Sequence, residues 1–414
     1  MEFSDMALPV KQVMPNAVPL YTLANDGRGA VRLELVFGGG YGVQDIPLQA
    51  TFTNRMLREG AQRLTAAEIS RRLDYYGAWI ESYSSQGANH ITLYSLSKHF
   101  LPLLQLLEQL VKQPLFSQEN LDVVRRSGKA HFEVNSRKVD VVAQRHFENA
   151  LWGSSHPLGH IVTAADYDAV TTAALYSYHE RFYNSRNCTI FLSGTYDSET
   201  ISAVTECFGA SEWGGGYVAN SLFVSPPQSQ IGRRNVLVDN TMQSAVKLGF
   251  FTLDASATDF HKLRFLTVLF GGYFGSRLMS NIREENGYTY HISAEVDAYG
   301  CRNAFMISSE TANEYVEPCI AEIYKEIDRL HNEPITAAEV DHVRNYILGE
   351  MCRECEGLSA KAEIFINAWL SGDEFSSVND YLNVVKSVSP DELNDIARRY
   401  IRKEKMIEVV AGQV

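Results

Sequence analysis

This chain has no run of basic residues and no long apolar run, and both absences narrow what it can do. Its 414 residues include 37 Lys and Arg against 50 Asp and Glu, a net charge of -13. Nucleic acid binding uses a basic stripe, so this charge balance argues against a polyanionic partner. Gly, Ser or a charged residue interrupts every apolar window well before the roughly 18 residues that a membrane-spanning helix needs.

We expect neither a secretory signal nor a disulfide framework from this sequence. Its first residues contain no basic region followed by an apolar core, which predicts a cytoplasmic protein. The six cysteines are scattered, unlike the dense cysteines of a disulfide-stabilised domain. Cys352 and Cys355 have redox or zinc-knuckle spacing, but they lie in a helical pattern without a second such pair. We therefore expect free thiols.

A long internal repeat indicates how the chain is divided. Gln113–Arg125 and Glu333–Arg344 share the order Pro, Ser or Thr cap, new helix, and each follows an amphipathic helix. A repeat this long indicates duplicated domains rather than a solenoid. The segment 212–232, rich in Gly, Pro, Gln and Ser, is typical of a linker. The predicted domains are residues 1–211 and 233–414.

Within each half, strand patterns alternate with helical patterns. A capping box at Thr65 and Glu68 begins one helix, which is expected to end at Gly77. The expected strands cover residues 31–37, 78–83, 89–96, 188–193, 245–251, 288–296, 303–309 and 406–410. These patterns predict the α+β class, with two duplicated domains that are each an antiparallel sheet packed with helices.

The most informative stretch runs from Gly271 to Tyr290. It is expected to finish a helix, turn at Gly287 and begin a strand. Arg283 then lies on the helical side of this joint and Tyr290 on the strand side. Such a pair can direct two hydrogen-bond donors at one carbonyl oxygen.

This stretch resembles the second-half signature of the pitrilysin/insulinase family of zinc peptidases, which includes mitochondrial processing peptidase. Further motifs occur in a similar order over nearly the whole chain, among them His156–Gly159, Tyr178–Asn187 and Phe191–Thr195. The resemblance implies a mitochondrial-processing-peptidase-like fold of the short, single-duplication type. It also implies that Arg283 and Tyr290 reach across an internal cleft to the carbonyl of a substrate at a zinc ion.

The zinc motif of the family is missing from this chain. Active relatives carry His-x-x-Glu-His on the opening helix, where residues at i and i+4 face one metal ion and the glutamate deprotonates the bound water. Here Thr51 and Arg55 occupy the ligand positions and Asn54 the base position. Thr is a poor zinc ligand, Asn accepts no proton at neutral pH, and Arg repels a dication. We therefore predict no metal ion and no cofactor in this chain.

The family's third zinc ligand is a glutamate on a later helix. By spacing it falls near residues 130–132, where His131 and Glu133 lie. We interpret these two side chains as part of a solvated helix face, because they lack the partners that catalytic zinc needs. A displaced metal site that also uses His146 and Glu148 is the alternative.

The arginine and the tyrosine also have ordinary structural interpretations. Arg283 could pair with Glu284 or Glu285, and such surface ion pairs contribute little to stability. Tyr290 could face the core, and Arg277 could be the functional arginine instead. We favour contact of Arg283 and Tyr290 with substrate, because spacing and motif context coincide.

An edge strand that pairs with an extended substrate peptide is a further family feature. The matching segment is Ile80–Ser85, with Glu81, Ser82 and Tyr83 at its centre. Strand addition uses main-chain hydrogen bonds and therefore tolerates changes of sequence. An ordinary amphipathic strand is the alternative interpretation.

These observations predict a zinc-free, catalytically incomplete subunit of a two-chain metallopeptidase. It would supply Arg283 and Tyr290 to a homologous zinc-bearing partner chain, or to a second copy of itself, and enclose an unfolded peptide. No peptidase activity is expected of the chain alone. The alternative, from a different functional class, is a non-enzymatic scaffold or peptide-binding protein derived from the same family.

Overall fold

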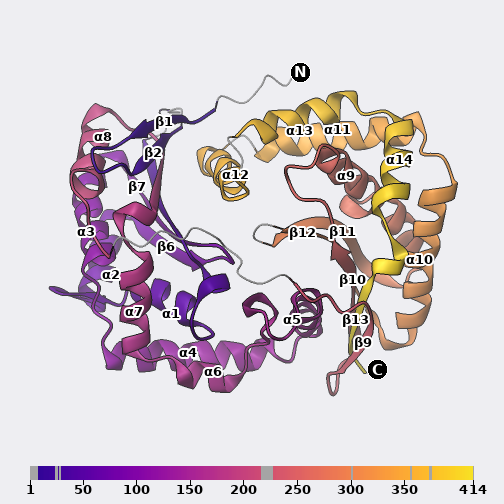
Figure 1. Cartoon of the computed structure of the whole chain (residues 1–414), viewed down its shortest axis with the longest axis horizontal. Helices are drawn as coiled ribbons and strands as arrows, with labels where there is room; N and C mark the ends of the chain where they lie inside the picture. The colour runs from indigo at the N-terminus through magenta and orange to yellow at the C-terminus, as the bar shows by residue number, and fades with distance from the viewer. Residues whose placement is uncertain are drawn as a thin grey trace.

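The computed structural model describes residues 8–23, 27, 29–215, 227–299, 302–354, 357–372 and 375–413. Two sheets with their helices form two halves that face each other (Figure 1). The N-terminal half, indigo to magenta, lies on the left of the view, and the C-terminal half, orange to yellow, on the right. Most of the predicted linker, residues 216–226, lies outside the described residues, so the domain boundary stays a prediction.

The first sheet has six strands in the order β1-β2-β8-β3-β7-β6. Every neighbouring pair is antiparallel except β2 and β8, which run parallel. The strands are β1 (Val10–Val13), β2 (Pro19–Thr22), β3 (Ala30–Gly38), β6 (Trp79–Ser84), β7 (Ala88–Leu96) and β8 (Cys188–Gly194). Two short strands, β4 (Gly60–Ala61) and β5 (Leu64–Thr65), pair separately.

The second sheet has five strands in the order β11-β12-β10-β13-β9. Here β9 and β13 form the parallel pair. The strands are β9 (Gly232–Leu237), β10 (Gln243–Phe251), β11 (Thr289–Tyr299), β12 (Arg302–Ala312) and β13 (Ile407–Gly412). From the parallel pair to the far edge, this order repeats that of the first sheet, so β11 corresponds to β6. The predicted α+β class is confirmed, with one parallel pair in each mostly antiparallel sheet.

Helices pack on both sheets and supply the cores. Those of the first half are α1 (Gln49–Met56), α2 (Ala66–Tyr76), α3 (Phe100–Lys112), α4 (Gln118–Asn135), α5 (Val139–Trp152), α6 (Ala164–Ala169), α7 (Thr172–Phe182) and α8 (Ser198–Val204). Those of the second half are α9 (Phe260–Thr267), α10 (Val316–Asn332), α11 (Ala337–Glu354), α12 (Leu358–Leu370), α13 (Ser376–Ser387) and α14 (Pro390–Tyr400).

The sequence repeat corresponds to a repeated set of hydrogen bonds. Arg125 donates through Nε to the Tyr167 carbonyl at 3.0 Å and through Nη2 to the Val170 carbonyl at 2.6 Å. Arg344 donates in the same way to the Val385 carbonyl at 2.9 Å and the Val388 carbonyl at 3.0 Å. Each guanidinium also pairs with the aspartate three residues before it. Arg125 and Arg344 are therefore equivalent residues that make the same contacts in the two halves.

One helix of each half packs on the sheet of the other half. Phe147 of α5 lies in a core cluster with Ala245 of β10 and Val409 of β13. Conversely, Phe365 of α12 lies in a cluster with Phe191 of β8. Figure 1 shows α12 beside the first half and α5 beside the second sheet. These exchanged contacts bury apolar surface between the halves and hold them in one arrangement.

The two faces of the first sheet have different environments. Leu33, Leu35 and Phe37 of β3 point into the main core with α3. Val36 lies in the cluster with α12, so Arg32 and Glu34 share its face, because side chains alternate along a strand. We call the face that α12 covers the inner face.

Several local signals in the sequence are present in the fold. Thr65 and Glu68 form the expected capping box, and α2 ends at Gly77 with φ of 61°. Cys352 is free, while its predicted companion Cys355 lies outside the described residues. Within the described part of the chain, no helix is both long and apolar enough to cross a membrane.

Candidate functional site

The helix that corresponds to the zinc-binding helix is α1. Thr51 is exposed, Arg55 is half-buried and Asn54 is fully buried. The helix follows Leu48, which has a left-handed φ of 67°, and it packs against β6 and β7. The three substituted positions therefore lie on one short helix but in three different environments.

Asn54 has a structural role that the sequence did not predict. Its amide nitrogen donates to the Tyr83 carbonyl at 2.6 Å and to the His90 carbonyl at 3.1 Å. These carbonyls belong to β6 and β7, so the side chain fastens α1 to the β6–β7 hairpin. A carboxylate in this place could donate to neither oxygen. The residue at the base position thus joins α1 to the β6–β7 hairpin through two donated hydrogen bonds.

Strand β6, which contains the predicted peptide-binding segment, forms an edge of the first sheet. Ser85 donates to the Ala88 carbonyl at 2.8 Å and closes the hairpin with β7. Ser85 and Ala88 form a hydrogen-bonded pair, and along an antiparallel ladder such pairs alternate with pairs that share no hydrogen bond. The backbone groups of Ile80, Ser82 and Ser84 therefore point away from β7. Arg58 donates to the Ile80 carbonyl at 2.7 Å and occupies one of these acceptors.

The inner face of β6 carries aromatic side chains that stack on the next strand. The ring of Trp79 lies 4.8 Å from that of Tyr94, and the ring of Tyr83 lies 4.2 Å from that of His90. Trp79 and Tyr83 are each 52% exposed. The exposed Glu81 lies between them along the strand. This edge therefore offers main-chain groups, two ring faces and one carboxylate to a ligand.

A buried cluster of Arg32, Glu34 and His90 lies next to these aromatic side chains. Glu34 on β3 is 1% exposed, pairs with Arg32 and lies 2.8 Å from Nδ1 of His90. Burying these charges is tolerable because they are paired and hydrogen-bonded. The group holds the imidazole on which Tyr83 stacks.

Arg283 lies in the second half, on the π-helical segment Met279–Glu285. Its guanidinium lies 4.9 Å from the centre of the Phe274 ring. No residue that the structure describes forms an ion pair with it, so the proposed pairing with Glu284 or Glu285 is not seen. Arg277, the alternative arginine, is occupied, since its Nε lies 2.9 Å from the Glu339 carboxylate.

Tyr290 lies on β11, the edge strand of the second sheet. The pairing of β11 with β12 shifts register between Thr289 and Ile292. This irregularity changes the alternation of side chains, so Ile292 is buried while Tyr290 is 85% exposed. The alternative in which Tyr290 faces the core is therefore wrong. Both Arg283 and Tyr290 remain able to make new hydrogen bonds.

The remaining candidate ligands do not assemble into a metal site. His131 and Glu133 are exposed on α4, as expected of a solvated helix face. Glu148 on α5 accepts a hydrogen bond from Gln144 at 2.9 Å, and its helix packs on the second sheet. Across the described ranges, no three His, Cys, Asp or Glu side chains are grouped so that they could hold a metal ion.

The second sheet carries a group of charged residues next to α5. Burial, with a contribution from Glu295, raises the pKa of Asp297 to about 6. Burial also lowers the pKa of Lys247, although Glu295, Asp297, Asp140 and Glu148 act in the opposite direction. Lys247 donates to the Ser308 hydroxyl at 2.9 Å. Negative charge thus exceeds positive charge at this place.

We expect Asp297→Asn to stabilise the chain at pH 7 by about 1–2 kcal/mol, allowing for partial exposure to solvent. The folded-state pKa is raised, so the favourable contribution of the protonated carboxyl is present below about pH 4 and is lost as the pH rises through about 6. Urea unfolding at pH 4 and 7 measures the effect. An equal gain at both pH values would contradict this assignment.

Comparison with known proteins adds the following. Residues 169–347 match the family model described as the peptidase M16 inactive domain. A Rickettsia bellii protein described as an uncharacterized zinc protease is 23% identical over 359 residues, covering 84% of each chain. A Helicobacter pylori protein described as a non-peptidase homolog is 22% identical over 382 residues, which is 89% of this chain and 85% of that protein.

Two solved structures show the same fold. A Pseudomonas fluorescens peptidase M16 inactive domain superposes with a TM-score of 0.88 at 21% identity, covering 98% of both chains. A chain of complex III from Candida albicans superposes with a TM-score of 0.79 at 12% identity, covering 98% of this chain and 96% of that one.

Proposed function

We propose that this chain is a zinc-free subunit of the M16, or pitrilysin/insulinase, peptidase family and that it completes the active site of a zinc-bearing homologue. The observation that carries the proposal is the bonding of Asn54. The side chain is a neutral carboxamide whose nitrogen donates to two main-chain carbonyls, so it supplies no carboxylate to take the proton of a zinc-bound water. The naming of one relative as a non-peptidase homolog also supports a chain without activity of its own.

In this proposal Arg283 and Tyr290 stabilise the oxyanion of the substrate, which is supported by their availability for new hydrogen bonds. The guanidinium is held over the Phe274 ring without a carboxylate partner among the described residues, and the phenol is 85% exposed. Both groups can donate to the oxyanion that forms when a peptide carbonyl is attacked. The partner chain would supply the zinc-activated water for that attack.

The edge of β6 accounts for peptide binding in this proposal. The outward backbone groups of Ser82 and Ser84 can pair with an extended peptide, as in other strand-addition complexes. Glu81 and Tyr83 then lie beside every second side chain of that peptide. The substrate is accordingly an unfolded segment rather than a folded domain.

The experiment compares the chain alone with a mixture. A homologue with an intact His-x-x-Glu-His motif from the same cell is purified, and cleavage of a quenched fluorescent peptide library is followed. We expect no cleavage by this chain, and cleavage by the mixture well above that of the homologue alone. Cleavage by this chain alone, or a mixture no faster than the homologue, would contradict the proposal.

A non-enzymatic scaffold is the second candidate function. It is favoured by the similarity of the fold to a chain in a structure of complex III. In that case Arg283→Ala would leave every measurable function unchanged, whereas changes at an assembly surface would not. A self-dimer in place of a heterodimer, and the cytoplasmic location, also stay proposals.

A further inference from the structure

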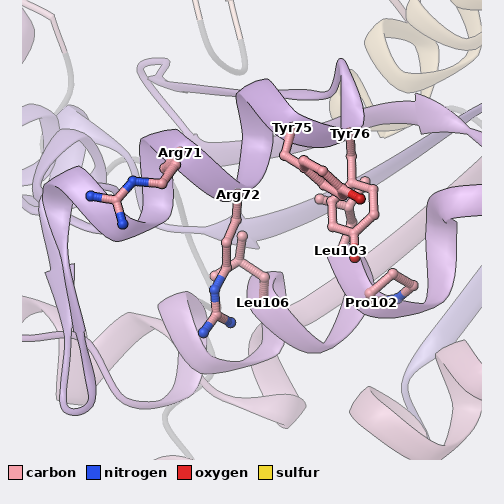
Figure 2. A pocket seen from close by; sticks show the side chains of 7 residues that line it. All are labelled: Arg71, Arg72, Tyr75, Tyr76, Pro102, Leu103 and Leu106. Carbon is pink, nitrogen blue, oxygen red and sulfur yellow. The ribbon is translucent and has the colours of Figure 1, made fainter.

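The outer surface of the first half contains a pocket between α2 and α3. Its volume is about 320 Å³, and it is lined by Arg71, Arg72, Tyr75, Tyr76, Pro102, Leu103 and Leu106. Figure 2 shows these side chains, four from α2 and three from α3. Ile69 of α2 and Leu103 belong to the main core, on the side of the sheet opposite α12. The pocket therefore lies on a different face of the sheet from the residues that α12 covers.

The lining of this α2–α3 pocket includes two aromatic side chains above an apolar floor. Tyr75 is 82% exposed, and its ring packs edge-to-face on that of Tyr76 at 5.0 Å. Leu103 and Leu106 are buried and form an apolar floor. Exposed aromatic groups over an apolar floor mark binding surfaces, because they offer a large contact area at a low cost in side-chain entropy.

The pocket is also positively charged, in a chain that is acidic overall. Arg71 and Arg72 are exposed, and neither forms an ion pair with any residue of the described ranges. The carboxylate of Glu68, one turn earlier, is held by the backbone and hydroxyl of Thr65 at 2.8 and 2.9 Å. Asp74 lies on the same helix but makes no ion pair with either arginine.

Tyrosine and arginine are the residue types that most often dominate binding energy at protein interfaces. Here two of each line one pocket, whose floor is apolar (Figure 2). The two guanidinium groups interact electrostatically with the Glu68 carboxylate one turn earlier but form no ion pair within the described ranges, so they can attract further carboxylates, whereas the chain's net charge of -13 repels acidic proteins elsewhere. The apolar floor and the two arginines of the pocket together favour a ligand with an apolar side chain next to acidic groups.

We propose that the α2–α3 pocket is a docking site for an acidic segment of a partner protein that inserts one large apolar side chain. The apolar side chain packs between Tyr75 and the floor at Leu106. Neighbouring Asp or Glu side chains accept hydrogen bonds from Arg71 and Arg72. This site lies on α2 and α3, apart from α1, Arg283 and Tyr290, and does not depend on the peptidase proposal.

The test uses the full chain and two labelled peptides of about twelve residues, long enough to cover one pocket of this kind and its rim. One peptide has Leu and Phe at its centre flanked by Asp and Glu, and the other has every acidic residue replaced by Lys. Fluorescence anisotropy is measured at low and high salt for the parent chain, for the double variant Arg71→Glu with Arg72→Glu, and for Tyr75→Ala. Arg126→Glu is the matched control, because Arg126 is exposed on α4 and lies outside the pocket.

We expect saturable, salt-weakened binding of the acidic peptide, and a loss of about tenfold or more in both pocket variants but not in the control. Equal binding of the two peptides, an unaffected double variant, or no saturable binding would overturn the proposal. Because all the substituted positions are exposed, each variant should keep the fold of the parent. Circular dichroism of each variant checks this. A dimer of the parent chain that the double variant dissolves would show instead that a second copy occupies the pocket.

Discussion

Replacing Asn54 by glutamate is expected to destabilise the folded chain by about 3–5 kcal/mol, the usual cost of an uncompensated buried charge. The new carboxylate would face the Tyr83 and His90 carbonyls, which now accept hydrogen bonds at 2.6 and 3.1 Å. It would be buried, and it would lose both bonds. Urea unfolding at pH 7 measures the loss.

The neighbouring position provides a control for this experiment. Thr51 lies on the same helix but is exposed, so Thr51→Glu should change the free energy of unfolding by less than about 0.5 kcal/mol. A glutamate at position 54 that is tolerated as well as one at position 51 would show that Asn54 does not hold α1 to the hairpin. The same reasoning predicts that the combined changes Thr51→His, Asn54→Glu and Arg55→His would damage the fold instead of creating a peptidase.

Arg283→Ala is expected to lower kcat of the two-chain peptidase by about 10²–10³, the usual loss when one oxyanion donor is removed. Tyr290→Phe should cost a similar factor, because it removes a hydroxyl and leaves the ring. KM should change little, since both donors bind the transition state more strongly than the substrate. Steady-state kinetics of the mixture with each variant tests this.

Arg126→Ala is the matched control, because this arginine is exposed on α4 and has no proposed role in catalysis. If Arg283→Ala raised KM and left kcat unchanged, the arginine would bind substrate uniformly. If it changed neither constant, the scaffold would become the better account. Both variants should fold, because Arg283 forms no ion pair with the described residues and Tyr290 is 85% exposed.

Features that depend on short stretches of sequence were predictable. The capping box at Thr65 and Glu68 and the two strands expected at residues 78–83 and 89–96 follow from residue types and spacing. The repeated arginines also indicated the duplication before their matching hydrogen bonds were seen.

Features that depend on distant contacts were not predictable. The sequences of α5 and α12 do not indicate that each helix packs on the sheet of the other half. An apolar stripe shows that a helix face is buried, but not which element covers it. The register shift that exposes Tyr290 also left no signal, since the alternation in the sequence placed it with Ile292. The stacks on β6 and β7 needed the register of the two strands.

The substitutions on α1 were visible in the sequence, but their consequence was not. The sequence shows that Thr51 and Arg55 are poor zinc ligands and that Asn54 cannot act as the base. The structure adds that Asn54 is used as a donor to two strands, so the position now has a different task. Asn54 thus both removes the catalytic base and fastens the hairpin to α1.

The zinc content of the purified chain tests the central claim most directly. The protein is loaded with excess zinc, dialysed against metal-free buffer, and measured by plasma mass spectrometry beside a homologue with an intact motif. We predict far less than one zinc per chain for this protein and about one for the homologue, as expected of a complete ligand set. One zinc per chain, retained on dialysis and lost in Thr51→Ala or Asn54→Ala, would contradict the account.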